Sequence, residues 1–138
     1  MATRTITTPD TFEGYPPGSR IPMHEVKSHA RASGSHWFDP DTLRSFGSKV
    51  PDAARIGPDG RAYFISSEQD RRYGDDRRYA AWNGERRYTL RAYDPSTGQV
   101  DGAERAADGG YDHDAFGRYR TLRTATTALR RLLDRPNV

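Results

Sequence analysis

The sequence predicts an α+β domain: a small antiparallel sheet of three to four strands, a C-terminal helix packed on one face, and short N-terminal helices. Three observations support this prediction. Residues 87–93 alternate in character and run into turn-forming residues 94–98, which is typical of a β-hairpin. The last thirty residues carry leucine and alanine at helical spacing. Asp39-Pro40 is a typical start of a short helix.

Composition predicts one domain with a small core. The chain has 138 residues, 33% of them hydrophobic, and its mean hydropathy is −0.99. Eight Tyr, five Phe and two Trp argue against full disorder, and the lack of Cys excludes disulfides and thiolate chemistry. Residues 1–22 are rich in Thr and Pro without a sustained period, so we expect a disordered or extended arm there and a compact domain over 23–135.

The sequence shows no membrane or export signal. No apolar run follows Met1, which predicts that there is no signal peptide. No stretch approaches the length of a membrane span. We therefore expect a cytoplasmic protein that does not contact a membrane.

Two helices are expected before the sheet. The first covers residues 23–33, with Met23, Val26 and Ala30 on one side and Gly34 as its stop. The second starts with Asp39 as N-cap and Pro40 at the first helical position. It is expected to pack Phe38 against Leu43 and to end at Gly47.

The predicted sheet is an antiparallel meander. Residues 49–56 form a short strand or loop and residues 57–60 a turn. Residues 61–68 include aromatic and branched side chains that would lie on both faces, which predicts a central strand covered on both sides. Residues 86–93 and 99–101 complete the hairpin.

Alternation in 86–93 assigns the two faces of that strand. Tyr88, Leu90 and Ala92 are expected to face the core. The opposite face, exposed to solvent or a partner, is expected to carry Arg87, Thr89, Arg91 and Tyr93.

The rest of the chain is expected to be an acidic, Gly-rich loop over 102–114 and then a helix from Ala115, capped by Thr121 or Thr124. The predicted core contains Trp37, Phe38, Leu43, Phe46, Tyr63, Ile65, Tyr88, Leu90, Leu129 and Leu132.

Arginine and tyrosine recur together in the second half of the chain. Net charge is +3, and Lys occurs only at positions 27 and 49. Guanidiniums for phosphates and flat rings for bases suit nucleic-acid binding. The alternative is a solvated face in which these arginines pair with nearby carboxylates. The candidate binding residues, including the basic face of the C-terminal helix, are Arg77, Arg78, Arg86, Arg87, Arg91, Tyr93, Arg120, Arg123 and Arg130.

No catalytic, metal or cofactor motif is present. Asp108, Asp112, His113 and Asp114 lack the order of a calcium loop, so a loop that offsets nearby arginines is the preferred interpretation. The spacings of His24, His29 and His36 do not suit a helical metal site. We expect no cofactor and no enzymatic activity.

Three blocks carry a resemblance when taken together: residues 36–48, 63–68 and 87–98. Over residues 35–133 the chain resembles a family of small uncharacterised proteins from actinobacterial phages and mobile elements. The resemblance implies a compact α+β domain and an origin in a mobile element, without a known activity.

Two functional hypotheses follow. The first is a non-enzymatic accessory protein of a phage or mobile element that binds a macromolecule, preferably nucleic acid, through its Arg/Tyr-rich face. The second is a small inhibitor or adaptor that docks on a host protein, such as a component of a defence system.

Overall fold

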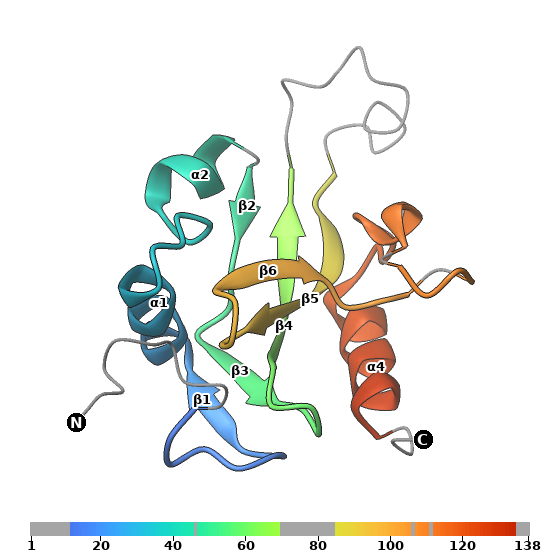
Figure 1. Cartoon of the computed structure of the whole chain (residues 1–138). Helices are drawn as coiled ribbons and strands as arrows, with labels where there is room; N and C mark the ends of the chain where they lie inside the picture. The colour runs from blue at the N-terminus through green and yellow to red at the C-terminus, as the bar shows by residue number, and fades with distance from the viewer. Residues whose placement is uncertain (1–11, 46, 70–84, 106, 111, 135–138) are drawn as a thin grey trace, which may run out of the picture.

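A computed structural model describes residues 12–45, 47–69, 85–105, 107–110 and 112–134, apart from the side chains of Ser45 and His113. The elements in chain order (Figure 1) are β1 (Arg20–Pro22), α1 (Met23–Ala32), α2 (Pro40–Ser45), β2 (Ser48–Lys49), β3 (Ala53–Ile56), β4 (Ala62–Glu68), β5 (Arg87–Asp94), β6 (Gln99–Gly102), the 3-10 helix η2 (His113–Ala115) and α4 (Leu122–Leu133).

Within the described residues, six strands form one antiparallel sheet in the order β1-β3-β4-β5-β6, and β2 also pairs with β4. The α+β class and the β4-β5-β6 meander are confirmed. The expected three to four strands are too few. β1 and β2 have only three and two residues, too few to show an alternating pattern, whereas β3 lies within residues 49–56, which were expected to form a short strand or loop.

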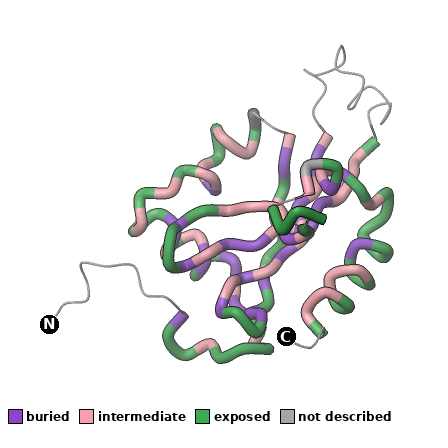
Figure 2. The backbone as a smooth tube through the Cα atoms, turned by 45° about the vertical axis from the view of Figure 1, so that its right-hand side comes forward, coloured by how far each residue is buried: buried purple, intermediate pink, exposed green. Residues whose placement is uncertain are grey.

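Helices cover both faces of the sheet. Figure 1 shows α1 and α2 on one side and α4 on the other. One core cluster joins α1 to β-strand residues such as Phe64 and Tyr93. A second cluster lies beneath α4 and includes Leu90, Ala92 and Ala125. Figure 2 shows the buried residues concentrated along the strands. β4 is thus central and covered on both sides, as expected.

Phe12 and Ile21, in the segment before α1, take part in this core. Phe12 is 7% exposed and packs in the first cluster, while β1 pairs with β3 through Ile21 and Ala54. The sequence did not predict this strand. The first part of the arm expected over residues 1–22 lies outside the described residues.

The N-terminal helices form where they were expected. α1 buries Met23, Val26 and Ala30. α2 begins at Pro40, but the Asp39 carboxylate contacts the His36 ring at 2.9 Å instead of capping the helix. Gly47 has a φ of 61°, a conformation that favours glycine. Phe46 lies outside the described residues.

The C-terminal helix is shorter than expected. Residues 113–115 form the 3-10 helix η2, and α4 begins only at Leu122. Thr121 is the N-cap, because its Oγ1 accepts a hydrogen bond from the Thr124 amide at 3.1 Å. Most of the predicted core residues pack in or against the two clusters: Trp37, Phe38, Tyr63, Ile65, Tyr88, Leu90, Leu129 and Leu132.

Candidate functional site

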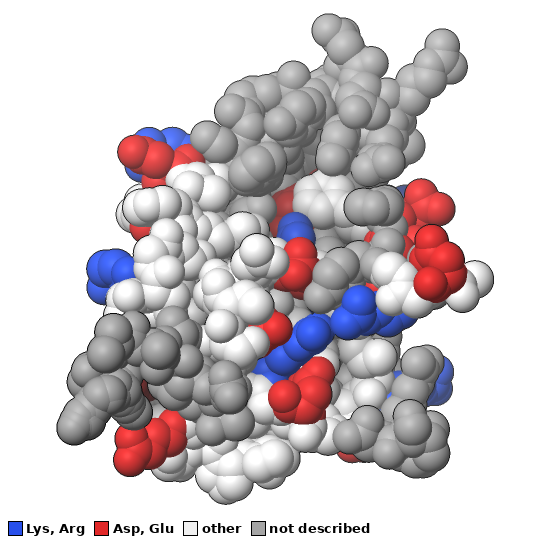
Figure 3. All heavy atoms as spheres, viewed as in Figure 1, with Lys and Arg blue, Asp and Glu red and all other residues white. Residues whose placement is uncertain are grey.

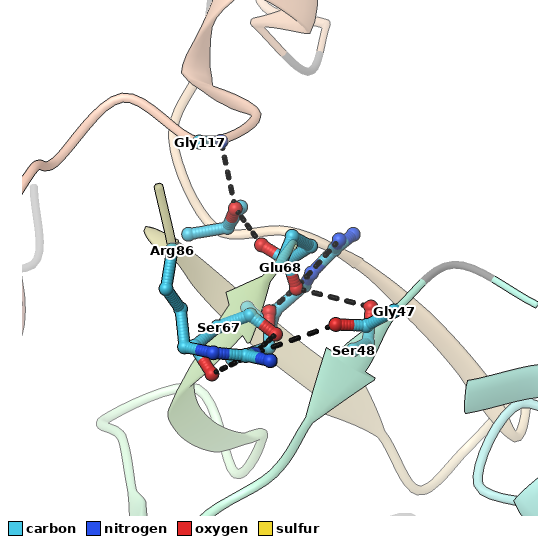
Figure 4. Close-up of polar contacts among 9 residues, drawn as sticks. Gly47, Ser48, Ser67, Glu68, Arg86 and Gly117 are labelled. Carbon is cyan, nitrogen blue, oxygen red and sulfur yellow. Dashed lines mark hydrogen bonds and ion pairs between the residues drawn. The ribbon is translucent and has the colours of Figure 1, made fainter. Parts of the chain in front are cut away.

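Polar side chains gather around the carboxylate of Glu68, where β4 ends (Figure 4). Glu68 is fully buried. Its Oε1 accepts a hydrogen bond from Thr89 Oγ1 at 2.6 Å, and its Oε2 accepts one from Ser48 Oγ at 3.2 Å. Thr89 Oγ1 in turn accepts from the Gly117 amide at 2.8 Å. The buried carboxylate therefore joins β2, β4, β5 and the segment that leads to α4.

Arg91 supplies the charge that balances Glu68. Its Nη2 lies 3.8 Å from Glu68 Oε2, and its Nε donates to Ser66 Oγ at 3.0 Å. The guanidinium carbon is 5.4 Å from the ring centres of both Trp37 and Phe116. The Arg91 side chain is only 14% exposed. The expectation that it faces outward is wrong, because aromatic rings cover this side of β5.

Tyr93 is also an internal residue. It is fully buried among Phe12, Phe38 and His29, with ring centres 5.6–6.0 Å away. Burial raises the pKa of the Tyr93 phenol. The predicted outward position of Tyr93 is wrong, as is that of Thr89, which is 2% exposed. The physical reason is that β5 lies inside the sheet and is covered on both faces.

Arg86 and Arg87 donate hydrogen bonds to groups inside the fold. Arg86 Nη1 donates to Ser67 Oγ at 2.8 Å and to the Ser67 carbonyl at 3.2 Å. Arg87 Nε donates to the Gly117 carbonyl at 3.0 Å. Both side chains are half-buried and join neighbouring segments. The candidates Arg77 and Arg78 lie outside the described residues.

The α4 arginines are placed differently. Arg123, Arg130 and Arg131 are exposed and lie within an arc of about 100° around the helix. The opposite side of α4 carries Ala125 and the leucines that pack on the sheet. The α4 basic strip is defined here as Arg123, Arg130 and Arg131 of α4 together with Arg120, which lies two residues before the helix. It contains three of the predicted residues; Arg131 was not among them.

Most arginines of the α4 basic strip have no carboxylate partner among the described residues. Arg120, with its side chain 72% exposed, lies 3.6 Å from Glu85 Oε2. Arg123, Arg130 and Arg131 make no ion pair with any residue that the structure describes. On the face shown in Figure 3, by contrast, basic and acidic side chains lie next to one another.

A second polar cluster lies between β6 and α4. Glu104 Oε2 accepts hydrogen bonds from Arg118 Nη1 at 3.0 Å and Tyr119 OH at 2.8 Å. Arg118 also bonds Asp112, and this hydrogen bond raises the pKa of the Arg118 guanidinium. The acidic loop thus offsets a nearby arginine, as expected. The sequence did not single out Glu104. Among described residues, no group of three His, Asp or Glu side chains is placed to hold a metal.

His29 lies beneath Phe12 and beside Tyr93. Its Nδ1 is 2.7 Å from Tyr93 OH, while its buried Nε2 has no hydrogen-bond partner among the described residues. Burial lowers the pKa of His29 from its usual 6.5. Its spacing to the other histidines gave no hint of this contact.

This burial predicts a pH dependence of stability. Because the folded pKa of His29 lies below the unfolded one, the unfolded chain binds the extra proton first as pH falls. The unfolding free energy should therefore decrease below about pH 6.5, relative to a His29→Gln variant that keeps a donor near Tyr93. Urea unfolding of both proteins at pH 7.5 and 5.5 measures the difference. Equal pH dependence in the two proteins would contradict a buried, neutral His29.

Together these features define a three-layer α+β protein with a buried ionic network and an arginine-bearing outer helix. In the described part of the chain, no helix has the length and apolar character needed to cross a membrane. The chain belongs to a family of unknown function (DUF7447), whose model matches residues 22–130. No curated protein and no solved structure matches it.

Proposed function

We propose that this protein is a non-enzymatic accessory protein of a phage or mobile element that binds nucleic acid through the α4 basic strip. The resemblance noted from the sequence supports the proposed origin. The family match supports a shared fold over residues 22–130, but it indicates no function, because the function of the family is unknown. A cytoplasmic location remains a prediction from the sequence.

The observation that carries the proposal is the set of exposed guanidiniums on one side of α4. Arg123, Arg130 and Arg131 lack carboxylate partners among the described residues, so their mutual repulsion is relieved by an anion. Arginine binds phosphate oxygens in a bidentate manner. A row of such groups on an outer helix matches a phosphate backbone.

The proposed surface is narrower than the one predicted from the sequence. Arg86, Arg87 and Arg91 donate hydrogen bonds inside the fold, and Tyr93 is buried. These residues hold the sheet and the segment before α4 in place. They act on binding indirectly, by positioning the helix that carries the strip.

Docking on an acidic host protein is the second candidate. The observation in its favour is Leu122, the one large hydrophobic side chain among the described residues that is exposed, at 54%. A single exposed leucine is common on monomer surfaces, whereas protein interfaces bury contiguous apolar area. Nucleic acid is therefore the preferred partner.

Fluorescence polarisation with labelled single-stranded and duplex DNA and RNA at low salt tests the proposal. The variant R123A/R130A/R131A should bind about tenfold more weakly than the wild type, because three phosphate contacts are lost. A matched control, R20A/R31A/R44A, removes three exposed arginines from β1, α1 and α2 and should bind like the wild type. Absence of wild-type binding to every probe would refute the proposal; in that case a stable complex from nuclease-treated host lysate would favour a protein partner.

A further inference from the structure

A hollow of about 480 Å³ lies between α4 and the sheet, next to the α4 basic strip. Its inner wall includes Leu90 and Leu132, and Arg123 and Arg131 border it on the solvent side. This volume falls within the range of about 300–1,000 Å³ typical of small-ligand pockets. We propose that the hollow receives an unpaired base of a bound single strand while the adjoining phosphates stay on Arg123 and Arg131. This inference rests on the proposed function and specifies the form of nucleic acid.

The charges around the hollow differ between its solvent side and its inner end. Arg123 and Arg131 are exposed, whereas the side chain of Glu104, which also lines the hollow, is 17% exposed. An anion is therefore attracted to the solvent side and repelled from the interior. A nucleotide entering with its ring inward and its phosphate outward satisfies both conditions.

The inner end favours a ring that carries N–H groups. Glu104 Oε2 is occupied by Arg118 and Tyr119. Its Oε1 is buried and accepts no hydrogen bond from the described residues. An unsatisfied buried acceptor is unfavourable, so a small rotation of the Glu104 side chain that brings Oε1 to an amino or imino group of an entering ring is stabilising. Leu90, Ala128 and Leu132 supply apolar surface for the faces of the ring.

This geometry predicts a preference for single-stranded over duplex nucleic acid. A base within a duplex has its pairing edge occupied and both faces stacked, and it must be unpaired to enter a hollow. A single strand offers its bases directly. We therefore expect single strands to bind more tightly than duplexes of the same charge.

The experiment compares a labelled mixed-sequence single strand with an abasic strand of equal length and phosphate number. The wild type should prefer the base-bearing strand by about tenfold, the effect of burying one base. Thr127 lines the hollow, so Thr127→Trp should remove this preference while leaving salt-dependent binding to the abasic strand. Thr126→Trp is the control. Thr126 is also exposed and also donates to the carbonyl four residues earlier, but it lines a different hollow.

Each outcome separates this inference from the proposed function. If neither single strand nor any duplex probe binds, the proposed function fails; if only a duplex binds, the base-binding hollow is refuted. If both strands bind equally, or if Thr127→Trp keeps the preference for bases, only the base-binding hollow is refuted. Nucleoside monophosphates, added at millimolar concentration, should compete far more weakly than the strand. Competition as strong as that of the strand itself would show that the hollow takes free nucleotides, and would overturn the assignment.

Discussion

Replacement of Tyr93 by alanine is expected to lower the unfolding free energy by about 3–5 kcal/mol, the usual effect of removing a large aromatic side chain from a core. Tyr93 is fully buried and contacts Phe12, His29 and Phe38. The loss combines the apolar area returned to water with a cavity between α1 and the sheet. Urea unfolding followed by circular dichroism measures it.

Two controls define the Tyr93 result. Tyr93→Phe keeps the ring and removes only the hydroxyl that contacts His29, so it should cost about 1 kcal/mol. Gln99→Ala changes an exposed residue of the neighbouring strand β6 and should stay within about 0.5 kcal/mol of the wild type. A Tyr93→Ala protein as stable as the Gln99→Ala protein would place Tyr93 on the surface and contradict the fold described for β5.

Loss of the Arg91 guanidinium is expected to be comparably damaging. Arg91→Met keeps the length of the side chain between Trp37 and Phe116 but leaves the buried Glu68 carboxylate without its cation. Removing one partner of a buried pair typically costs about 3–5 kcal/mol, and the partial exposure of Arg91 places the expected loss near the lower value. The same urea titration measures this loss.

A double-mutant cycle isolates the interaction itself. Glu68→Gln removes the negative charge and keeps an acceptor for Thr89 Oγ1. Combined with Arg91→Met, it should be less destabilising than the sum of the single changes, because the uncompensated buried charge is gone. Strict additivity would mean that Glu68 and Arg91 do not stabilise each other.

The elements predicted from the sequence are those with a long local pattern. β4 and β5 have seven and eight residues with branched and aromatic side chains, and α1, α2 and α4 have caps or spacing that can be read directly. β2 and β3 form on the edge of β4, and β1 forms on the edge of β3. Of these three strands, the sequence offered only residues 49–56 as a short strand or loop, because such short strands depend on their partners more than on a local pattern.

The two faces of β5 show a second limit of prediction from the sequence. Its alternation separates Leu90 and Ala92 from Arg91 and Tyr93, and the structure keeps that separation. What alternation cannot show is whether the second face is covered, since that depends on α1 and the residues around Phe12. Arginine next to a buried glutamate looks the same in a sequence as arginine facing water. The α4 arginines could be placed on the surface from the sequence, because they lie on the opposite side of the helix from an apolar stripe.

The most direct test of the account is the salt dependence of nucleic-acid binding. For single-stranded DNA, the slope of log affinity against log salt concentration changes by about 0.7 per phosphate contact. The R123A/R130A/R131A variant should therefore show a slope about two units shallower than the wild type, while R20A/R31A/R44A keeps the wild-type slope. Equal slopes for the wild type and the α4 variant would contradict a phosphate-binding role for the α4 basic strip.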